Sequence, residues 1–307
     1  MIETVECNGQ PRDMGCDQGR VLGERIRDAV ERVGLPLRRS RIANLRPFVS
    51  GRAKGAGTGR ELVRHFTHLG ERIDGLARYA DVDVQSIFEL HERAARCEPG
   101  GEPLSAPASA VAGVGLAGAS GVGVLRGLPA RADAPVPYVL RRSRPEVGFA
   151  SVEVTLPWLV TALAGVNTAG VCVALAPQRG WPGGLPAAAP SHLLVQECLQ
   201  RFEDVGACID WCLKRPVLGD GTLVLADARG RVATVEFDGE SRSVDDAGKG
   251  PVGADASGPW ASVSDPGDSE RLLGLEAGGL ELALDADAKL LSLRRIGDDA
   301  EKIVVRA

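Results

Sequence analysis

Helical periodicity dominates the first hundred residues of the chain. Apolar residues recur at three- and four-residue spacing from Arg20 to Val33 and again from Leu62 to Leu76, and each pattern predicts an amphipathic helix with one buried face. Asp83 is a typical helix N-cap and predicts the start of a third helix. The Arg- and Gly-rich stretch from Leu35 to Gly59 has weak periodicity, so it predicts a loop.

The pattern changes to that of β-strands beyond the Pro- and Gly-containing stretch from Glu98 to Pro103. Short apolar runs follow, together with a run of strict apolar–polar alternation, which is typical of a half-buried strand. The predicted strands are Val111–Val114, Gly121–Leu128, Pro137–Arg142, Val152–Leu156, Leu159–Val166 and Val171–Ala176. The last two flank the turn sequence Asn167-Thr168-Ala169-Gly170 and predict a hairpin.

Two further helices and a second group of strands complete the pattern. The helices are predicted at Leu194–Phe202 and Val205–Leu213. The strands are predicted at Thr222–Ala226, Arg231–Phe237, Trp260–Val263, Leu290–Ile296 and Lys302–Val305. Helices and strands come in blocks and do not alternate regularly, so the chain favours an α+β layered sandwich over a repeated βαβ unit.

Composition narrows the functional classes. The 307 residues are 44% hydrophobic, enough for one large domain or two small ones, and the net charge of −5 gives no basic field for nucleic acid or anionic lipid. Residues 1–20 lack a signal-peptide core, and no apolar run reaches transmembrane length. Seven cysteines without a CxxC pair indicate a reduced, cytoplasmic protein. Abundant Gly, Ala and Arg are typical of a GC-rich, bacterial-type genome.

The two later helices carry cysteines, a residue type that binds zinc. Cys208 and Cys212 are four residues apart, and Cys198 and His192 lie on the preceding segment. The pair lacks the tight-turn spacing of zinc ligands, and helical cysteines commonly serve as small core residues. The sequence therefore predicts no metal site here.

Two histidines, a glycine-rich stretch and one further cysteine are each explained by a structural role without catalysis or ligand binding. His65 and His68 are three residues apart without a carboxylate signature, so we expect them on a helix surface. Gly118 to Gly123 is Gly-rich but joins two predicted strands and lacks the following helix and Lys of a phosphate loop. Cys97 ends a helix and is expected to be a helix-end thiol. No cofactor is predicted.

Five segments resemble one enzyme family in their order and spacing. They are Asn8–Gly19, Glu71–Ala80, Leu140–Pro145 with the strand that follows it, Leu163–Val171 and Leu225–Gly230. Together they are similar to the isopenicillin N acyltransferase-like (acyl-CoA:6-aminopenicillanic acid acyltransferase) family of N-terminal-nucleophile hydrolases. The resemblance covers most of residues 1–240, whereas the C-terminal segment matches poorly.

The resemblance implies a fold and a chemistry. The fold is the four-layer αββα sandwich, with an N-terminal helical region at residues 1–97 and the sandwich core at 98–307, together one compact unit. The family cleaves its own backbone before a Cys, whose freed α-amine then serves as the base for the thiol of the same residue. An acyl group passes through a thioester, and nearby donors stabilise the oxyanion.

This chain departs from the family pattern at three functional positions. Ala108 stands at the nucleophilic Cys and Pro107 at the residue before it, so the nucleophile and the backbone freedom for cleavage are both lost. Pro129 stands at the organising Asp. Thr222, or Gly221 after a one-residue slip, stands at the Asn of the oxyanion hole. The resemblance therefore predicts a catalytically degenerate protein that does not cleave itself.

Two alternatives stay open. Ser109 or Ser105 could act as the nucleophile of an active acyltransferase or amidase, although a structural hydroxyl on a strand is the simpler interpretation. Arg142 and Arg144 share one face of a predicted strand while Arg141 points to the other, so the pair could hold a ligand carboxylate or form surface ion pairs.

Further ligand contacts are predicted at Ser109 and Thr222. The expected partners are a small amide or acyl ligand, a second copy of the chain or an active paralogue. Neither nucleic acid nor a membrane is expected as a partner.

Overall fold

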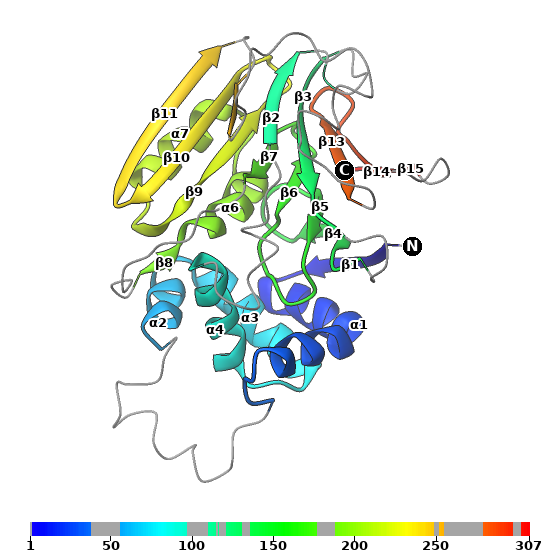
Figure 1. Ribbon diagram of the computed structural model, residues 1–307, viewed down its shortest axis with the longest axis vertical. Helices are drawn as coiled ribbons and strands as arrows, with labels where there is room; N and C mark the ends of the chain where they lie inside the picture. The colour runs from blue at the N-terminus through cyan, green and yellow to red at the C-terminus, as the bar shows by residue number, and fades with distance from the viewer. Residues whose placement is uncertain are drawn as a thin grey trace.

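A computed structural model gives the fold (Figure 1). The structure describes residues 2–37, 56–96, 110–114, 116, 121–130, 136–176, 188–248, 252–254, 279–296 and 302–307. The predicted loop at Leu35–Gly59 lies largely outside these residues, and its described end from Ala56 is the start of helix α2 (Ala56–His65). The predicted strand at Trp260–Val263 and the predicted helix-end thiol of Cys97 lie wholly outside them.

The strands form two sheets. The nine-stranded sheet has the order β1 (Glu3–Gly9), β4 (Val139–Pro145), β5 (Ser151–Thr155), β6 (Ala164–Asn167), β7 (Cys172–Leu175), β9 (Val217–Ala226), β10 (Val232–Gly239) and β11 (Ser241–Gly248), with β8 (Ala189–Pro190) beside β9. The six-stranded sheet has the order β12 (Val252–Ala254), β2 (Ala110–Val114), β3 (Val122–Leu128), β13 (Leu280–Asp285), β14 (Leu290–Arg295) and β15 (Lys302–Arg306). Neighbouring strands are antiparallel except β1 with β4 and β8 with β9.

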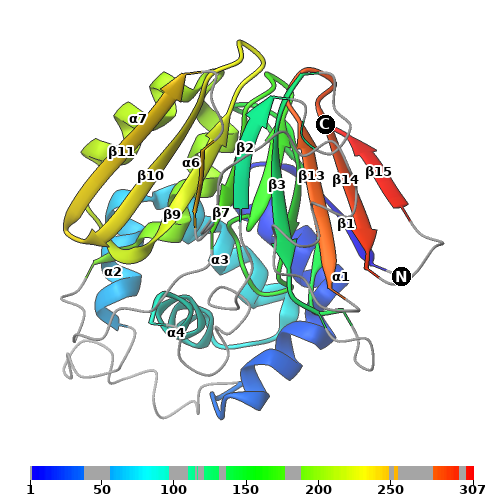
Figure 2. The same ribbon diagram turned by 45° about the horizontal axis from the view of Figure 1, so that its top comes forward.

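The two sheets pack face to face, and Figure 2 shows β2 and β3 lying over β7 and β9. Helices α6 (Leu194–Arg201) and α7 (Val205–Lys214) pack against the other face of the nine-stranded sheet. Helices α1 (Pro11–Arg32) and α3 (Thr67–Ala80) pack together, and α1 also contacts β1 and β4. Helices α2 (Ala56–His65) and α4 (Val84–Ala95) lie beside α3, and the short 3-10 helix η3 (Ser191–Leu193) precedes α6. The predicted α+β sandwich is confirmed.

Glycines allow α1 and α3 to pack with their backbones almost in contact. A Cβ atom at Gly15 would lie 2.0 Å from the carbonyl oxygen of Arg72, and one at Gly75 would lie 2.1 Å from that of Arg12. No other residue fits at either position. Two of the segments that carry the family resemblance, Asn8–Gly19 and Glu71–Ala80, therefore meet at this helix contact.

Asn167 and Asp227 lie in two other segments that carry the sequence resemblance, and their side chains stabilise turns by hydrogen bonds. Asn167 Oδ1 accepts hydrogen bonds from the backbone N–H groups of Ala169 and Val171, and its amide nitrogen donates to two carbonyl oxygens at the end of α6. Asp227 accepts from the backbone N–H groups of Arg229 and Arg231 and from the start of α7. The predicted hairpins are confirmed, and both side chains fasten a hairpin to a helix.

Several elements differ from the sequence-based predictions. The single helix expected from Leu62 to Leu76 is two helices, α2 and α3, because Phe66 leaves the helical conformation with φ −135° and ψ 55°. β1 and β13 were not predicted as strands. β11 was also missed because it is an exposed edge strand rich in polar residues, and its sequence therefore lacks an apolar period.

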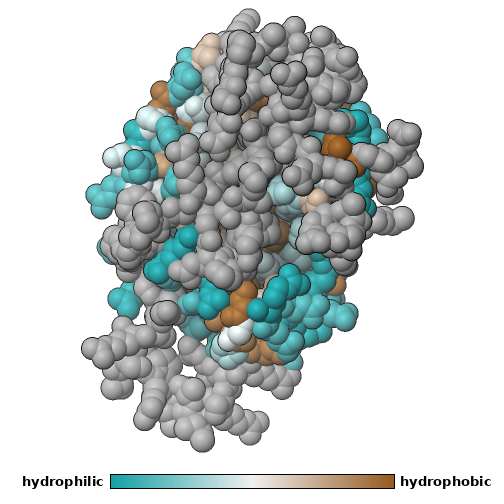
Figure 3. Space-filling view, in the orientation of Figure 1, coloured by the Kyte–Doolittle hydropathy of each residue, from teal (hydrophilic) through white to brown (hydrophobic). Residues whose placement is uncertain are grey.

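One continuous apolar core runs through the sandwich and into the helices. It joins residues of α1, α3 and α4 to residues of both sheets. On the face shown in Figure 3, the described surface is mostly polar with small apolar spots. No described helix is long and apolar enough to cross a membrane.

Candidate functional site

The predicted nucleophile segment lies at the edge of what the structure describes. Ala108, Ser109 and Ser105 fall outside the described residues, and β2 begins at Ala110. β2 lies between β12 and β3 in the six-stranded sheet, as expected for an inner strand. The described part of the predicted site consists of the residues around the start of β2.

A buried arginine stands beside the start of β2. Arg126 of β3 is the register partner of Ala110, and its side chain is 2% exposed. Its Nη1 donates to the carbonyl oxygen of Leu163, just before β6, so the side chain crosses the space between the two sheets. Its Nε has no partner among the described residues. Burial lowers the pKa of Arg126 to about 10, which still leaves the guanidinium protonated at neutral pH.

Pro129, where the sequence resemblance predicts the loss of an organising carboxylate, carries an apolar ring. Pro129 follows β3 and is half-buried, and its carbonyl oxygen accepts a hydrogen bond of 2.8 Å from the hydroxyl of Tyr138. Burial raises the pKa of Tyr138, so the phenol stays neutral and acts as a donor. Pro129 itself supplies no side-chain acceptor, so neither residue provides a carboxylate to orient a nucleophile.

Strand register places Thr222 on the inner face of the nine-stranded sheet. Register pairing joins Glu153 to Gly165, Gly165 to Val173 and Val173 to Leu225, so these four residues share one face of the sheet. This is the helix-covered face, because Glu153 accepts a hydrogen bond from Gln196 of α6. Because alternate residues of a strand point to opposite faces, Thr222 lies on the face that packs against β2 and β3. It is half-buried. Thr222 thus faces the region predicted for the site.

The two arginines predicted as ligand contacts share one surface carboxylate. Arg142 Nη1 lies 3.2 Å from Glu6 Oε1, and Arg144 Nη1 lies 3.4 Å from Glu6 Oε2. The shared face of Arg142 and Arg144 is therefore as predicted, and in this structure it carries ion pairs to β1.

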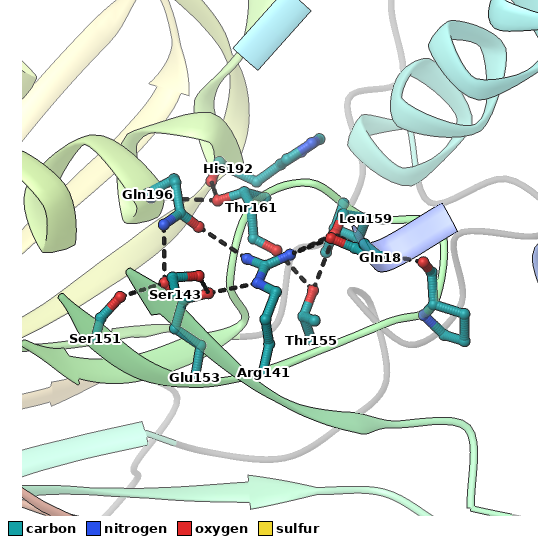
Figure 4. Close-up of polar contacts among 11 residues, drawn as sticks. Gln18, Arg141, Ser143, Ser151, Glu153, Thr155, Leu159, Thr161, His192 and Gln196 are labelled. Atoms are coloured by element: carbon teal, nitrogen blue, oxygen red, sulfur yellow. Dashed lines mark hydrogen bonds and ion pairs between the residues drawn. The ribbon is translucent and has the colours of Figure 1, made fainter. Parts of the chain in front are cut away.

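Arg141, on the other face of β4, is fully buried in a polar cluster (Figure 4). Its Nε donates to Glu153 Oε2 over 2.6 Å, and its Nη2 donates to Gln196 Oε1 of α6 over 2.9 Å. Its Nη1 donates to Gln18 Oε1 of α1 and to the carbonyl oxygen of Leu159. The guanidinium thus ties α1, α6 and two strands together.

The carboxylate of Glu153 is equally well satisfied. Its Oε1 accepts from Ser151 Oγ and from Gln196 Nε2, and its Oε2 also accepts from Ser143 Oγ. Burial alone would raise the pKa of Glu153, but the positive charge of Arg141 and the hydrogen bonds outweigh it, so the pKa is lowered. The buried Arg141–Glu153 pair therefore has hydrogen-bond partners for both of its charged groups and serves a structural role.

The sequence interpretation named Arg142 and Arg144 and did not assign a role to Arg141. Strand alternation did place Arg141 on the opposite face, which was the available signal. Its partners come from residues 12 to 123 positions away in the chain, so no local pattern could identify them.

Two histidines form a second buried contact. His91 Nδ1 lies 3.1 Å from His192 Nε2, and Trp158 packs edge-on against the His91 ring at 5.5 Å between ring centres. Burial lowers the pKa of His192 to about 3 and that of His91 well below 6.5, so both rings are neutral at pH 7. His192 is therefore bonded to another histidine and not to the cysteines considered with it.

The cysteines of α6 and α7 pack together in the core. Cys198 Sγ lies 3.8 Å from Cys212 Sγ, and Cys208 is buried beside them. Contact with the neighbouring thiols, together with burial, raises the pKa of Cys198. Within the described residues, no group of three or more His, Cys, Asp or Glu side chains is arranged to hold a metal ion.

His68 has a different environment from the one expected. His65 lies 3.3 Å from Glu61 on its own helix, whereas His68 Nε2 lies 2.7 Å from Oε1 of Glu197, a carboxylate with no exposed side-chain area. Glu197 also accepts from Trp211 Nε1. His68 is therefore held against α6 and is not a freely solvated residue.

The strand order and layers define the class as a two-sheet α+β sandwich. No family model matches the chain, and no curated protein sequence matches it. Penicillin V acylase from Agrobacterium tumefaciens aligns with a TM-score of 0.45 and 14% identity over 64% of this chain and 86% of that chain. A variant of conjugated bile acid hydrolase from Clostridium perfringens aligns with a TM-score of 0.42 and 11% identity over 64% and 92%.

A Caenorhabditis elegans N-acylethanolamine-hydrolyzing acid amidase ortholog aligns with a TM-score of 0.39 and 9% identity, over 58% of this chain and 93% of that chain. Likeness at this level carries no argument about activity. The fold assignment rests on the sheets and helices of the chain itself.

Proposed function

We propose that the protein is a catalytically degenerate acyltransferase- or amidohydrolase-like protein that does not cleave itself and that binds a small amide or acyl ligand. The sequence support is the resemblance to the isopenicillin N acyltransferase-like family, combined with Ala108 in place of its Cys. Pro129, whose side chain offers no acceptor, and the short hydroxyl of Thr222 extend the loss to two further positions. Restoring one group would leave the others missing.

The buried side chain of Arg126, the register partner of Ala110, carries the proposal. A guanidinium held between two sheets is costly to bury, and the fold retains it beside the strand where the family chemistry begins. Its unpaired Nε is a donor available to a ligand carbonyl or carboxylate. A site that keeps a donor and lacks a nucleophile fits ligand binding better than turnover.

The second candidate function is an active acyltransferase or amidase that uses Ser109 or Ser105. The observation that favours it is the same unpaired Arg126 Nε, because a donor near the start of β2 could also stabilise an oxyanion. Ser109 immediately precedes β2 and is the better placed of the two in the sequence.

Intact-mass spectrometry and N-terminal sequencing separate the two functions. The degenerate protein stays one chain and hydrolyses neither acyl-CoA nor simple amides above the level of a Ser109→Ala/Ser105→Ala double variant. Cleavage before Ser109 or Ser105, or turnover that the double variant abolishes, would establish the alternative. Arg126→Met serves as a second variant, because it should weaken ligand binding in the first case and turnover in the second.

Pairing with a second copy or with an active paralogue in the cytoplasm is part of the same proposal. In such a pair, a catalytically degenerate protein serves as a structural or regulatory subunit. Light scattering after size-exclusion chromatography tests self-association. Co-expression with a cleaving homologue, followed by measurement of its turnover, tests the mixed pair.

A further inference from the structure

A cavity of about 460 Å³ lies on the helix side of the nine-stranded sheet. Two turns form much of its wall, Gly9–Pro11 between β1 and α1 and Pro145–Gly148 between β4 and β5. The α3 residues His68, Leu69 and Arg72 and the end of α6 complete it. Its volume is within the range of small-molecule sites.

Arg72 at this cavity is a buried charge without a hydrogen-bond partner. The residue is 1% exposed, and none of its three guanidinium nitrogens has a partner among the described residues. The thiol of Cys7, a weak acceptor, lies beside it. The charge of Glu153 also acts on Arg72, but the oxygens of that carboxylate are already bonded to Arg141, Ser143, Ser151 and Gln196. Burial, reinforced by the nearby charge of Arg141, lowers the pKa of Arg72 to about 10, so the side chain remains a cation at neutral pH.

Arg141 provides an internal comparison. Both arginines are fully buried, yet Arg141 meets one carboxylate and three amide or carbonyl oxygens, whereas Arg72 meets none by hydrogen bond. Burying an unpaired cation is strongly unfavourable. The difference indicates that the partner of Arg72 is supplied from outside the chain, through the cavity that Arg72 lines.

The other charges around the cavity define the ligand charge. Gln10 Nε2 donates to Glu146 Oε2, which joins the two turns and leaves a negative group at the wall. His68 is already held by Glu197, and Arg201 lies 3.5 Å from the same carboxylate. One unpaired cation with a carboxylate nearby suits a monoanion better than a phosphate dianion.

The start of α1 adds a weaker attraction for an anion. Gly9, Gln10 and Pro11 line the cavity, and no side chain caps the helix at Gln10. The first turn of this 22-residue helix therefore brings the positive end of its dipole to the cavity wall. This contribution is secondary to the charge of Arg72.

Apolar groups form the remaining wall. Met14 and Leu69 are buried, and Pro11, Pro145 and Val147 lie on the two turns and the helix start. Such surfaces match a hydrocarbon or aromatic group attached to the charged end of a ligand. We propose that this cavity binds a small organic monocarboxylate with an apolar group, its carboxylate pairing with Arg72. The site is separate from Arg126 and does not depend on the function proposed above.

Small carboxylates, a neutral amide and inorganic phosphate test the proposal on the intact protein. Benzoate should bind saturably, seen by titration calorimetry and as a raised melting temperature, because it joins a monocarboxylate to a ring. Benzamide has the same shape without the charge and should bind at least tenfold more weakly, as expected for loss of a charged hydrogen bond. Inorganic phosphate should not compete. Equal binding of benzoate and benzamide, or failure of acetate, hexanoate and benzoate alike to bind, would overturn the proposal.

Variants inside and outside the cavity test where benzoate binds. Arg72→Gln should lose benzoate binding at least tenfold, whereas Arg20→Gln, an exposed arginine of α1 outside the cavity, should retain it. If Arg72→Gln fails to fold, Glu146→Gln keeps the test decisive. Removing that negative charge should tighten benzoate binding by about twofold to fivefold and leave benzamide unchanged. Unchanged benzoate affinity in Glu146→Gln, or normal benzoate binding by folded Arg72→Gln, would refute the assignment.

Discussion

Arg141 Nε donates to Glu153 Oε2 over 2.6 Å, and both side chains are fully buried between the nine-stranded sheet and its helices. The pair connects β4 to β5, and its further hydrogen bonds reach α1 and α6. A buried ion pair of this kind fixes which helices meet the sheet more than it adds net stability. The elements that it joins, α1, β4 and β5, each adjoin one of the two turns that border the Arg72 cavity.

Removing one member of the Arg141–Glu153 pair should strongly destabilise the fold. Arg141→Met leaves the carboxylate of Glu153 buried without its cation, and we expect a loss of about 3–5 kcal/mol in the free energy of unfolding. Urea denaturation measures it. Glu6→Gln, which removes the surface partner of Arg142 and Arg144, should cost at most about 1 kcal/mol. Equal losses for the two variants would contradict the assigned burial.

Acid should destabilise the protein from near-neutral pH downward. The pKa of His192 is about 3 in the folded protein and 6.5 as its ordinary value, so the unfolded chain binds the proton first as pH falls. Stability is therefore fully present above about pH 6.5 and declines toward pH 3, by up to about 1.4 kcal/mol per pH unit for each such histidine. The lowered pKa of Glu153 acts in the same direction at lower pH.

Unfolding free energies measured between pH 7 and pH 4 test this pH dependence. His192→Gln removes one titrating ring while keeping a polar group toward His91, so its slope against pH should be shallower than that of the natural chain. An unchanged slope would show that the histidine pair does not govern the response.

Repair of the nucleophile alone should not restore cleavage. Ala108→Cys supplies a thiol but leaves Pro107 before it, Pro129 at the organising position and Thr222 at the oxyanion position. Loss of one oxyanion donor alone costs about 10²–10³ in rate. We expect one band on a denaturing gel after prolonged incubation. Two bands, with a new N-terminus at residue 108, would show that the family alignment or the roles given to these positions are wrong.

The α1–α3 contact should reject a methyl group at Gly75. The added Cβ would lie 2.1 Å from the carbonyl oxygen of Arg12, which is backbone and cannot rotate away. Gly75→Ala is therefore expected to cost about 1–3 kcal/mol of stability.

Gly23 on α1 provides the matched control. An added Cβ there would be 3.3 Å from the flexible end of Arg27, and alanine favours the helix by about 1 kcal/mol. Gly23→Ala should be neutral or stabilising in thermal denaturation. A Gly75→Ala protein as stable as Gly23→Ala would show that the helices do not approach so closely.

The sequence by itself determined most elements and the fold class. Apolar periodicity located α6, α7 and the part of α1 that follows Arg20. Asp83 caps α4 as predicted and accepts a hydrogen bond from the backbone N–H of Gln85. Short apolar runs and one run of strict alternation located most of the strands, and strand geometry placed Arg142 and Arg144 on a common face. These features were readable because each depends on neighbours within a few residues of the chain.

Only the tertiary structure decided which polar groups are paired. Arg141 and Arg72 carry the same charge and are both buried, yet one meets Glu153, Gln18 and Gln196 and the other lines a cavity without a hydrogen bond. Their environments are set by helices and strands that are distant in sequence and that meet through the order of the sheet and the close α1–α3 packing. The local sequence pattern fixes the face of the strand or helix on which a side chain lies. Whether a buried charge stabilises or destabilises the fold depends on the groups that the rest of the fold places beside it.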